Sequence, residues 1–465
     1  MRRRTRGAFL NLLLFLGALF FIFYLNGTGG GNGGGGSSSD RDRGRGRGSG
    51  GRHRFFAWST VHYKTPATTL PASRGICPGL ADAETSKPAL VVARVTADGD
   101  TRWLEDDAFG ISQKYHVCIY TADAPDPDRD RDPADLDPTS HHLRVPANRG
   151  HEAMAYLTFL IDNYAHIPAA GAVFVHGSRW AWHNDMPDYD NAAALQALNV
   201  SAALEPVGYH NLRCDWSAST CPTLDTDSKV WPGQASLATS IRAMLEPWNE
   251  RVVSDAALPL ALVALFGDAG TSTSASVRHD KSKSELTVPG DRLMLGRNDA
   301  VRAQCCAQFV VSRDSVWRHS RDEYIALRQW LLDGSETKTE TEKNTNVGAA
   351  PPNDRVAGRI LSYIWHILFI RPCNSNAVPN SNSGLDSSSS SSSSSSPFCD
   401  GSADIDLDID LDRLNVLACP PARECYCRLY GRCDLQGCTS PERCPGQYVV
   451  PPHFRLPPDW AERHS

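Results

Sequence analysis

Two histidines and an aspartate lie close together in residues 176–190, a polar stretch that directly follows an apolar run. The stretch reads HGSRWAWHNDMPDYD. Imidazole nitrogen and carboxylate oxygen atoms are suitable ligands for divalent ions such as Mn²⁺ or Mg²⁺. His176, His183 and Asp185 therefore form a candidate metal site. The two tryptophans of the same stretch offer flat apolar faces for a sugar ring or a nucleobase.

Other charged residues could supply phosphate binding and proton transfer. Arg94 and Arg179 could hold phosphate, because guanidinium groups donate forked hydrogen bonds to phosphate oxygens. Glu152 or Asp185 could act as the base that deprotonates an acceptor hydroxyl. Together with a metal, these groups meet the needs of a transferase that uses a nucleotide sugar, namely a cation for the diphosphate and a carboxylate for the acceptor.

Each of these residues also has a purely structural interpretation. His176 could do no more than cap the end of a strand, and Glu152 could be a first-turn charge that the helix dipole favours. Asp188 and Asp190 match the D-x-D motif of transferases, but this Asp-rich chain contains several other such pairs. The motif alone therefore does not separate a metal ligand from an ordinary surface aspartate.

Cysteine chemistry is the other reaction that the sequence raises. Cys305 and Cys306 are adjacent, but a reactive thiolate needs a neighbouring cation or a helix N-terminus, and a cysteine pair in an oxidising compartment is more often structural. Cys214 and Cys221 could close a small disulfide ring. The six cysteines of residues 416–446 lack paired C-x-x-C units, so disulfides are favoured over zinc there.

The elements that would position these groups alternate between strands and helices. An apolar run at 172–175 ends at His176, and a helix with a buried stripe starts near Glu152. This alternation predicts an α/β fold with a mainly parallel sheet and flanking helices, in which ligands bind beyond the carboxyl ends of the strands. Further strands are expected at 89–95, 115–121, 142–145 and 305–312, helices at 103–111, 192–204, 237–248, 320–332 and 356–370, and a strand or helix at 258–266.

The composition indicates an oxidising compartment and argues against nucleic-acid binding. The chain has 465 residues, and its 47 Lys+Arg against 53 Asp+Glu give it no general attraction for nucleic acid. Half of its 14 cysteines lie after residue 398. A cysteine content of this kind is typical of secreted and luminal proteins, in which disulfides persist.

The N-terminus predicts a membrane anchor. Four arginines among the first six residues precede the uncharged apolar run 7–25. As a helix, about 19 residues span roughly 28 Å, close to the hydrocarbon core of a bilayer. The arginines should stay in the cytoplasm, which makes the chain a single-pass protein with its bulk in the lumen of the ER or Golgi. Cleavage as a signal peptide is the alternative, but no A-x-A-like site follows.

This interpretation divides the chain into a tail, an anchor, a linker and one luminal domain. Low-complexity stretches, which include ten consecutive serines, cannot bury a core and mark long disordered insertions. The expected boundaries are 1–6 for the cytoplasmic tail, 7–25 for the anchor, 26–87 for the stem, 88–372 for the luminal α/β domain with insertions at 126–138, 270–287 and 334–354, 373–415 for a low-complexity insertion, 416–446 for a Cys-rich tail that belongs to the domain, and 447–465 for a C-terminal extension.

Several blocks of the sequence together resemble an uncharacterised fungal family of membrane-anchored proteins, domain-of-unknown-function family 3431. The resemblance covers roughly residues 88–431 apart from the insertions, and membership implies no settled activity. The blocks are VVAR (91–94), ANRGHEAMAYLTFLIDNY (147–164), FVHGSRWAWHND (174–185), GYHNLRCDW (208–216), CCAQFVVSR (305–313), GRILSYIWHILF (358–369) and ECYCRLYG (424–431).

The helix start and the strand end also resemble those of bacterial rhamnan-synthesis glycosyltransferase-like proteins. In that pattern N-x-G-x-E/D opens a helix, and a later strand ends in His-x-x-Lys/Arg. The matching positions are Asn148, Gly150 and Glu152, then His176 and Arg179. This chain has Glu where those proteins usually have Asp. The resemblance implies a fold like that of nucleotide-sugar transferases, and it makes Asn148 a further candidate for cofactor binding.

The sequence supports three hypotheses about function. The first is a membrane-anchored, glycosyltransferase-like enzyme of the secretory pathway that acts on glycans or cell-wall precursors with a nucleotide sugar and Mn²⁺ or Mg²⁺. The second is a non-catalytic luminal binding or scaffold protein. The third is a metal-dependent hydrolase that uses the same histidines. The enzyme hypotheses require that Glu152, His176, His183 and Asp185 converge on one pocket.

Overall fold

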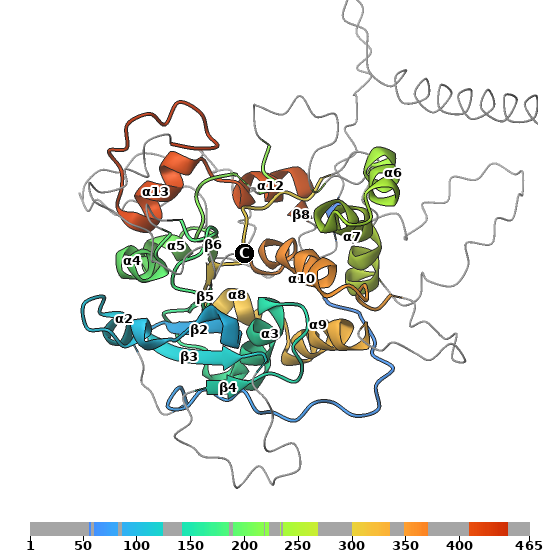
Figure 1. Cartoon of the computed structure of the whole chain (residues 1–465), viewed down its shortest axis with the longest axis horizontal. Coiled ribbons are helices and arrows are strands. Elements are labelled where there is room, and N and C mark those ends of the chain that lie inside the picture. The colour runs from blue at the N-terminus through green and yellow to red at the C-terminus, as the bar shows by residue number, and fades with distance from the viewer. Residues whose placement is uncertain are drawn as a thin grey trace, which may run out of the picture. The chain divides into compact units, whose positions relative to one another are not determined.

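The computed structural model of the chain is drawn in Figure 1. It describes residues 55–56, 60–81, 86–123, 142–185, 189–217, 219–222, 233, 236–267, 300–334, 348–370 and 409–444.

A mixed sheet of six strands forms the centre of the described part. Its strand order is β4-β3-β2-β5-β7-β6. Neighbouring strands from β4 to β5 are parallel, whereas β7 runs antiparallel to both β5 and β6. The strands are β2 (Ala89–Arg94), β3 (His116–Thr121), β4 (His142–Arg144), β5 (Ala172–His176), β6 (Tyr209–Asn211) and β7 (Phe309–Val311), and a separate antiparallel pair joins β1 (Phe55–Phe56) to β8 (Ile409–Asp410).

Both faces of the sheet are buried, as the continuous apolar strands predict. Side chains alternate along a strand, so Val91 and Ala93 of β2 belong to one hydrophobic cluster, and Leu90 and Val92 belong to another. All four are at most 7 % exposed. The sheet is therefore the middle layer between two sets of helices.

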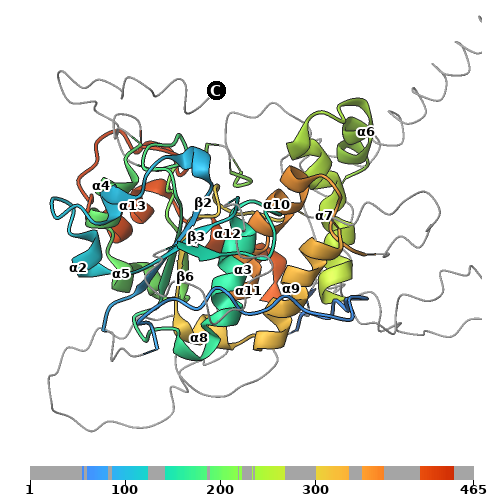
Figure 2. The same ribbon diagram turned by 60° about the horizontal axis from the view of Figure 1, so that its bottom comes forward.

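Figures 1 and 2 show the two helical layers. The larger cluster includes buried residues of α3 (Glu152–Asp162), α7 (Glu250–Phe266), α8 (Arg313–Trp317), α9 (Arg321–Asp333), α10 (Asp354–Ser362), α11 (Trp365–Phe369) and α12 (Leu411–Ala418). The smaller cluster includes those of α2 (Ile111–Lys114), α4 (Asn191–Ala197), α5 (Val200–Leu204) and α13 (Ala422–Tyr430), and α6 (Leu237–Leu245) packs against α7.

The predicted α/β class, with a mainly parallel sheet and flanking helices, is confirmed. The ambiguous run 258–266 is the second half of the helix α7. Three expected helices are not continuous. Residues 192–204 are divided between α4 and α5, and 356–370 between α10 and α11, while 103–111 contains only the end of a 3-10 turn (Arg102–Leu104) and the first residue of α2. Residues 208–222, where no strand or helix was expected, contain the strand β6, whose residues pair with β7 although their sequence is polar.

Three of the expected boundaries need correction. Residues 60–81, assigned to the stem, contribute buried Val61, Cys77 and Leu80 to the core. The end of the expected insertion 334–354 also belongs to the fold, because the Gly348 carbonyl accepts a hydrogen bond from the Trp330 indole at 2.8 Å. Residues 409–415, assigned to a low-complexity insertion, form β8 and the start of α12. Proline, glycine and polar residues interrupt the apolar positions of these segments, so they could not be recognised as core from the sequence.

The expected anchor, residues 7–25, lies outside the described residues. Among the helices that the structure describes, none combines the length and the apolar character needed to cross a bilayer.

Glu323 ties residues 60–81 to the domain. It lies in the first turn of α9, where Ser320 and Glu323 form a capping box. Its carboxylate accepts hydrogen bonds from the Val61 N–H (2.9 Å) and the Ser320 N–H (2.9 Å), and contacts His319 Nδ1 at 2.8 Å. Burial alone would raise the pKa of Glu323, but these hydrogen bonds outweigh it and lower the pKa.

We expect Glu323→Gln to lower the free energy of unfolding at pH 7 by about 1–3 kcal/mol, since hydrogen bonds to a charged group are lost. A lowered carboxyl pKa stabilises the fold above the unfolded-state value, and the effect disappears as the pH falls through the folded-state value. Denaturant unfolding at pH 7 and near pH 3 measures the difference. Glu424→Gln, which removes an exposed pair with Arg428, is the control. An equal loss at both pH values would contradict the prediction.

Candidate functional site

A pocket of about 680 Å³ lies beyond the carboxyl end of β5, where the turn before α3 meets the segment that follows β5. The last residue of β5 and the first residue of α3 both line it. Loops before β7 and after β6, together with the N-terminal turn of α7 and one side of α10, complete its walls. The lining residues are His151, Glu152, His176, Trp182, His183, Ser219, Thr220, Glu250, Arg251, Ala303, Gln304, Cys305, Cys306, Arg355, Gly358, Arg359, Ser362 and Tyr363.

A fixed turn before α3 places Glu152 at the pocket. The Arg149 guanidinium is buried and donates hydrogen bonds to the carbonyls of Leu331, Pro351 and Pro352. Gly150 has a φ of 73°, which favours glycine, and its N–H donates to the Asp354 carboxylate at 2.5 Å. Glu152 is half-buried and, within the described residues, has no hydrogen-bond or ion-pair partner.

His176 and His183 face each other in this pocket. Their ring centroids are 4.2 Å apart. The Nε2 atom of His176 contacts the carbonyl oxygen of Cys306 at 2.8 Å, and its backbone N–H donates to Gln308 Oε1 at 3.2 Å. Gln308 in turn donates to Asn184 Oδ1 at 3.0 Å. Two residues just before β7, Cys306 and Gln308, therefore hold His176. The pocket brings three of the predicted residues together: Glu152, His176 and His183.

Trp182 supplies an apolar face at the mouth of the pocket. Its side chain is 53 % exposed and meets the His183 ring edge-to-face at 5.5 Å. The Arg213 guanidinium donates to the Trp182 carbonyl at 2.8 Å, and it lies 5.8 Å from the indole centroid. An exposed but braced indole suits stacking against a ring of a ligand.

Three arginines of the pocket were not identified from the sequence. Arg251 is the second residue of α7, while Arg355 and Arg359 lie one turn apart on α10. Arg355 pairs with Glu250 at 3.2 Å, and Arg251 donates to the Ser219 carbonyl at 2.6 Å. The guanidinium of Arg359 makes no hydrogen bond or ion pair within the described residues. The spacing of four between Arg355 and Arg359 indicated that both arginines lie on the same side of a helix. Nothing in the sequence indicated that this helix, α10, faces the end of β5.

A buried carboxyl lies beside these arginines. Asp255 of α7 is 5 % exposed. Burial raises the pKa of Asp255, although the nearby Arg251 and Arg359 favour its charged form. Where it is ionised, the Asp255 carboxylate therefore offsets part of the positive charge of Arg251 and Arg359.

Asp185 does not reach the pocket, which corrects the predicted metal site. Its side chain is 3 % exposed. It accepts hydrogen bonds from the Cys214 N–H at 2.5 Å, the Asp215 N–H at 3.3 Å and the Tyr426 hydroxyl at 2.9 Å. Among the described residues, its oxygens do not come within 4.8 Å of both histidines to form a three-ligand set. The carboxylate is satisfied by its surroundings instead.

The predicted phosphate ligands are also placed elsewhere. Arg179 forms a forked ion pair with Asp190, with both N–O distances at 2.9 Å, and its guanidinium lies over the rings of Phe109 and Trp180. Arg94 donates to the Gly99 carbonyl at 2.7 Å. Asn148 is exposed in the turn before α3. None of the three lines the pocket.

One member of the D-x-D pair Asp188 and Asp190 has a structural role. Asp190 caps α4 by accepting the Ala192 N–H at 2.9 Å, and Asp188 lies outside the described residues.

The disulfides correct the expected pairing. Cys214 and Cys221 do not bond to each other. Instead, Cys214 pairs with Cys425 and Cys221 pairs with Cys419, so the Cys-rich tail is bonded to the loop after β6. Within the tail the pairs are Cys427–Cys433 and Cys438–Cys444. This outcome favours disulfides over zinc in the tail, as expected.

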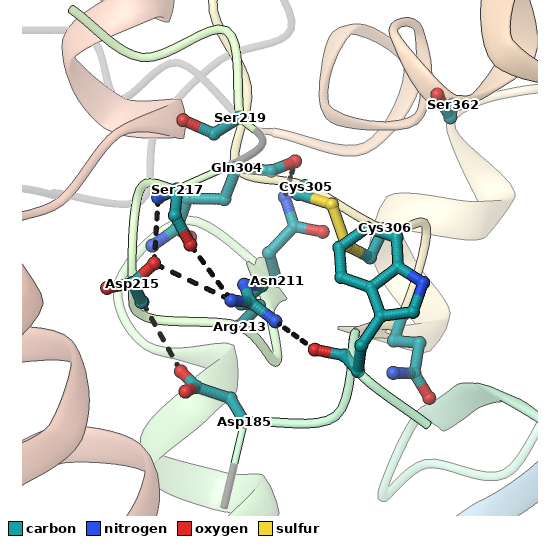
Figure 3. The surroundings of a disulfide bond; sticks show 12 residues. Asp185, Asn211, Arg213, Asp215, Ser217, Ser219, Gln304, Cys305, Cys306 and Ser362 are labelled. Atoms are coloured by element: carbon teal, nitrogen blue, oxygen red, sulfur yellow. Dashed lines mark hydrogen bonds and ion pairs between the residues drawn. A yellow bond between two sulfur atoms is a disulfide. The ribbon is translucent and has the colours of Figure 1, made fainter. Parts of the chain in front are cut away.

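Cys305 and Cys306 form a disulfide with each other, drawn in Figure 3. They are therefore not a free nucleophile in this state. The one group of potential metal ligands found among the described residues is Cys77, His116 and Cys118. Its two sulfurs are bonded to each other, so they are not available to a metal.

Comparison with known proteins places the chain in a family. No curated protein and no solved structure matches the chain. A family profile, described as protein of unknown function (DUF3431), matches residues 90–428. That range contains every residue of the pocket. The matched region makes up most of the chain, and the protein therefore belongs to the DUF3431 family.

Proposed function

We propose that the protein is a glycosyltransferase-like enzyme that binds a nucleotide sugar in the pocket beside α10. The observation that carries the proposal is the convergence of Glu152, His176 and His183 with three arginines. One of these, Arg359, has no hydrogen-bond or ion-pair partner for its guanidinium among the described residues. Arginine suits the diphosphate of such a donor, and the exposed Trp182 suits its base or sugar ring. A pocket of about 680 Å³ lies in the range of small-molecule sites.

In this proposal Glu152 takes the proton of an acceptor hydroxyl. The acceptor oxygen then bonds to the anomeric carbon of the donor, and the bond from that carbon to the diphosphate breaks. Arg251, Arg355 and Arg359 would stabilise the negative charge that develops on the departing diphosphate. The acceptor would be a glycan or a cell-wall precursor.

The histidine pair would hold a divalent ion, Mn²⁺ or Mg²⁺, whose positive charge would help to neutralise the donor diphosphate. His183 and the Nδ1 atom of His176 would offer nitrogen ligands, because Nε2 of His176 already contacts the Cys306 carbonyl. Asp185 is excluded because its oxygens are occupied. Sites that bind Mg²⁺ often use only one or two protein ligands and complete the shell with substrate phosphates and water. The donor diphosphate would therefore complete the coordination.

The same proposal places the enzyme in the ER or Golgi lumen, anchored by residues 7–25. Six disulfides join described residues, and disulfides of this number are compatible with a luminal or secreted location.

Ligand-induced stabilisation of the full-length chain tests the proposal. We expect UDP or GDP together with Mn²⁺ to raise the melting temperature, because ligands that bind only the folded state stabilise it. Arg359→Ala should weaken nucleotide binding about 10- to 100-fold, since hydrogen bonds to charged groups contribute about 1.5–3 kcal/mol each. Calorimetric titration measures the affinity.

Arg102→Ala is the matched control, because Arg102 is exposed and pairs only locally with Asp100. It should leave binding unchanged. Stabilisation by Mn²⁺ alone would favour a metal-dependent hydrolase. No stabilisation by either ligand would reject the enzyme and leave a non-catalytic binding or scaffold protein.

A further inference from the structure

The disulfide between adjacent cysteines is accessible from the pocket. Cys305 and Cys306 both line the pocket and are half-buried (Figure 3). By contrast, the three bonds that join distant segments of the domain are shielded: in Cys77–Cys118 and Cys214–Cys425, for example, Cys77 is 2 % exposed and Cys214 is not exposed at all. Reduction requires access of a thiolate to a sulfur atom. A small reductant that enters the pocket can therefore reach Cys305–Cys306 without opening the core.

This disulfide constrains the backbone next to it. Cys306 has a φ of 93° and Ala307 a φ of 49°, values that residues with a side chain rarely adopt. The N–Cα bond of Cys306 is part of the small ring that the disulfide closes. Rotation about that bond is restricted while the ring is intact, and opening the ring allows Cys306 to move to a negative φ.

Hydrogen bonds on both sides confine such a movement to a few residues. Ala303 exchanges hydrogen bonds with Thr220, whose hydroxyl accepts at 2.8 Å and whose N–H donates at 3.0 Å. After the turn, the Gln308 carbonyl accepts the Leu212 N–H at 2.9 Å. The backbone between these two anchors is therefore the part that responds to reduction.

The constrained peptide group contacts a residue of the candidate site. The Cys306 carbonyl lies 2.8 Å from His176 Nε2, and the His176 ring packs against that of His183. A change in the φ of Cys306 rotates the peptide that carries this carbonyl. The state of the disulfide is thereby connected to the orientation of both imidazoles.

We propose that Cys305–Cys306 is a thiol–disulfide exchange site that switches the pocket between two states. A thiolate of a dithiol reductant attacks one of the two sulfurs, forms a mixed disulfide and releases the other cysteine, which takes up a proton. The second thiol of the reductant then displaces the first cysteine. The net result is two protonated cysteines and one disulfide in the reductant. In the reduced state the Cys306 carbonyl leaves His176.

The first experiment measures which disulfide opens. The full-length protein is incubated with increasing dithiothreitol, the thiols are blocked with N-ethylmaleimide, and labelled peptides are quantified by mass spectrometry. We expect label on Cys305 and Cys306 at dithiothreitol concentrations that leave Cys77–Cys118, Cys214–Cys425 and Cys221–Cys419 closed. Opening of Cys305–Cys306 only together with those buried bonds would overturn the proposal.

The second experiment measures the effect on His176. Diethylpyrocarbonate acylates accessible imidazole nitrogens, and Nε2 of His176 is covered by the Cys306 carbonyl. We expect reduction to increase the acylation rate of His176 severalfold, while the exposed His151 of the same pocket reacts equally in both states. The double substitution Cys305→Ala/Cys306→Ala should give the faster rate without reductant.

Cys427→Ala/Cys433→Ala is the matched control, because it removes a disulfide with an exposed member that does not line the pocket. It should leave the acylation of His176 unchanged. An unchanged rate in wild-type protein whose Cys305 and Cys306 are fully labelled would also overturn the proposal. The acylation rate of His176 in reduced wild-type protein tests the proposal even if the alanine variant fails to fold, and it does not depend on any enzymatic activity.

Discussion

Simultaneous removal of the two disulfides that join the Cys-rich tail to the loop after β6 should destabilise the protein far more than removal of either one. The pairs Cys214–Cys425 and Cys221–Cys419 close loops with sequence separations of 211 and 198. In the chain-entropy description, a closed loop of this length stabilises the folded state by about 5 kcal/mol. However, the two bonds enclose almost the same loop. When one disulfide is intact, forming the second closes a much smaller ring. Its size is the difference between the two separations, 211 and 198, which is 13 residues. Closing a ring of this size stabilises the folded state by about 3 kcal/mol.

We therefore expect Cys214→Ala/Cys425→Ala, and separately Cys221→Ala/Cys419→Ala, to lower the free energy of unfolding by about 3 kcal/mol each, whereas the four-site variant should lose about 8 kcal/mol. A loss of that size exceeds half of the typical stability of a domain. Denaturant unfolding monitored by circular dichroism under non-reducing conditions measures the three variants.

Cys427→Ala/Cys433→Ala provides the control, because that bond closes a separation of only 6. Its effect should add to that of either bridge, since the loops are independent. If each bridge variant lost about 5 kcal/mol, or if the four-site variant lost no more than one bridge variant, the shared-loop explanation would be wrong.

The pairing of these cysteines illustrates what the sequence could not supply. Cys214 and Cys221 are seven positions apart, and a local ring is the simplest pairing of two neighbouring cysteines. The actual partners lie about 200 residues away because α13 packs beside α5. Cysteine positions limit the possible pairings but do not select one, because pairing depends on the folded arrangement.

The central strands were predictable for a clear physical reason. A strand buried on both faces carries an uninterrupted apolar run, as β2 and β5 do, and a capping box such as Ser320–Glu323 marks a helix start through local hydrogen bonds. The strand β6 has the sequence Tyr-His-Asn and is buried because β7, α5 and α11 cover it. Its identity is determined by tertiary contacts that no local pattern reports.

The candidate site was predictable in part. His176 ends a strand and Glu152 starts a helix, and polar groups at these positions of an α/β sheet commonly face the same edge. The structure brings both to one pocket. Arg251 and Arg359 could not be assigned to it, because their place depends on how α7 and α10 pack across the sheet edge.

Asp185 and Glu152, the two carboxylates proposed as bases, should respond to substitution in opposite ways. Asp185→Ala should lower the free energy of unfolding by about 3–5 kcal/mol, because it leaves buried donors on Cys214, Asp215 and Tyr426 without an acceptor. Glu152→Ala should change the free energy of unfolding by less than about 1 kcal/mol, because it removes only the favourable interaction of a half-buried carboxylate with the dipole of α3. The same variant should, however, abolish transfer to an acceptor if Glu152 is the base.

The pH dependence of Asp185→Asn separates the charge of this carboxylate from its hydrogen bonds. Burial raises the pKa of Asp185, although Arg213 and the hydrogen bonds from Cys214 and Tyr426 favour the charged form. A raised carboxyl pKa contributes stability at acid pH that is lost as the pH rises through the folded-state value. The asparagine variant cannot ionise, so its deficit relative to wild type should be largest in acid and should shrink toward neutral pH. Unfolding curves between pH 4 and pH 8 measure this difference, and a deficit that grows with pH would show that the anion, rather than the neutral acid, is the form that the cluster stabilises.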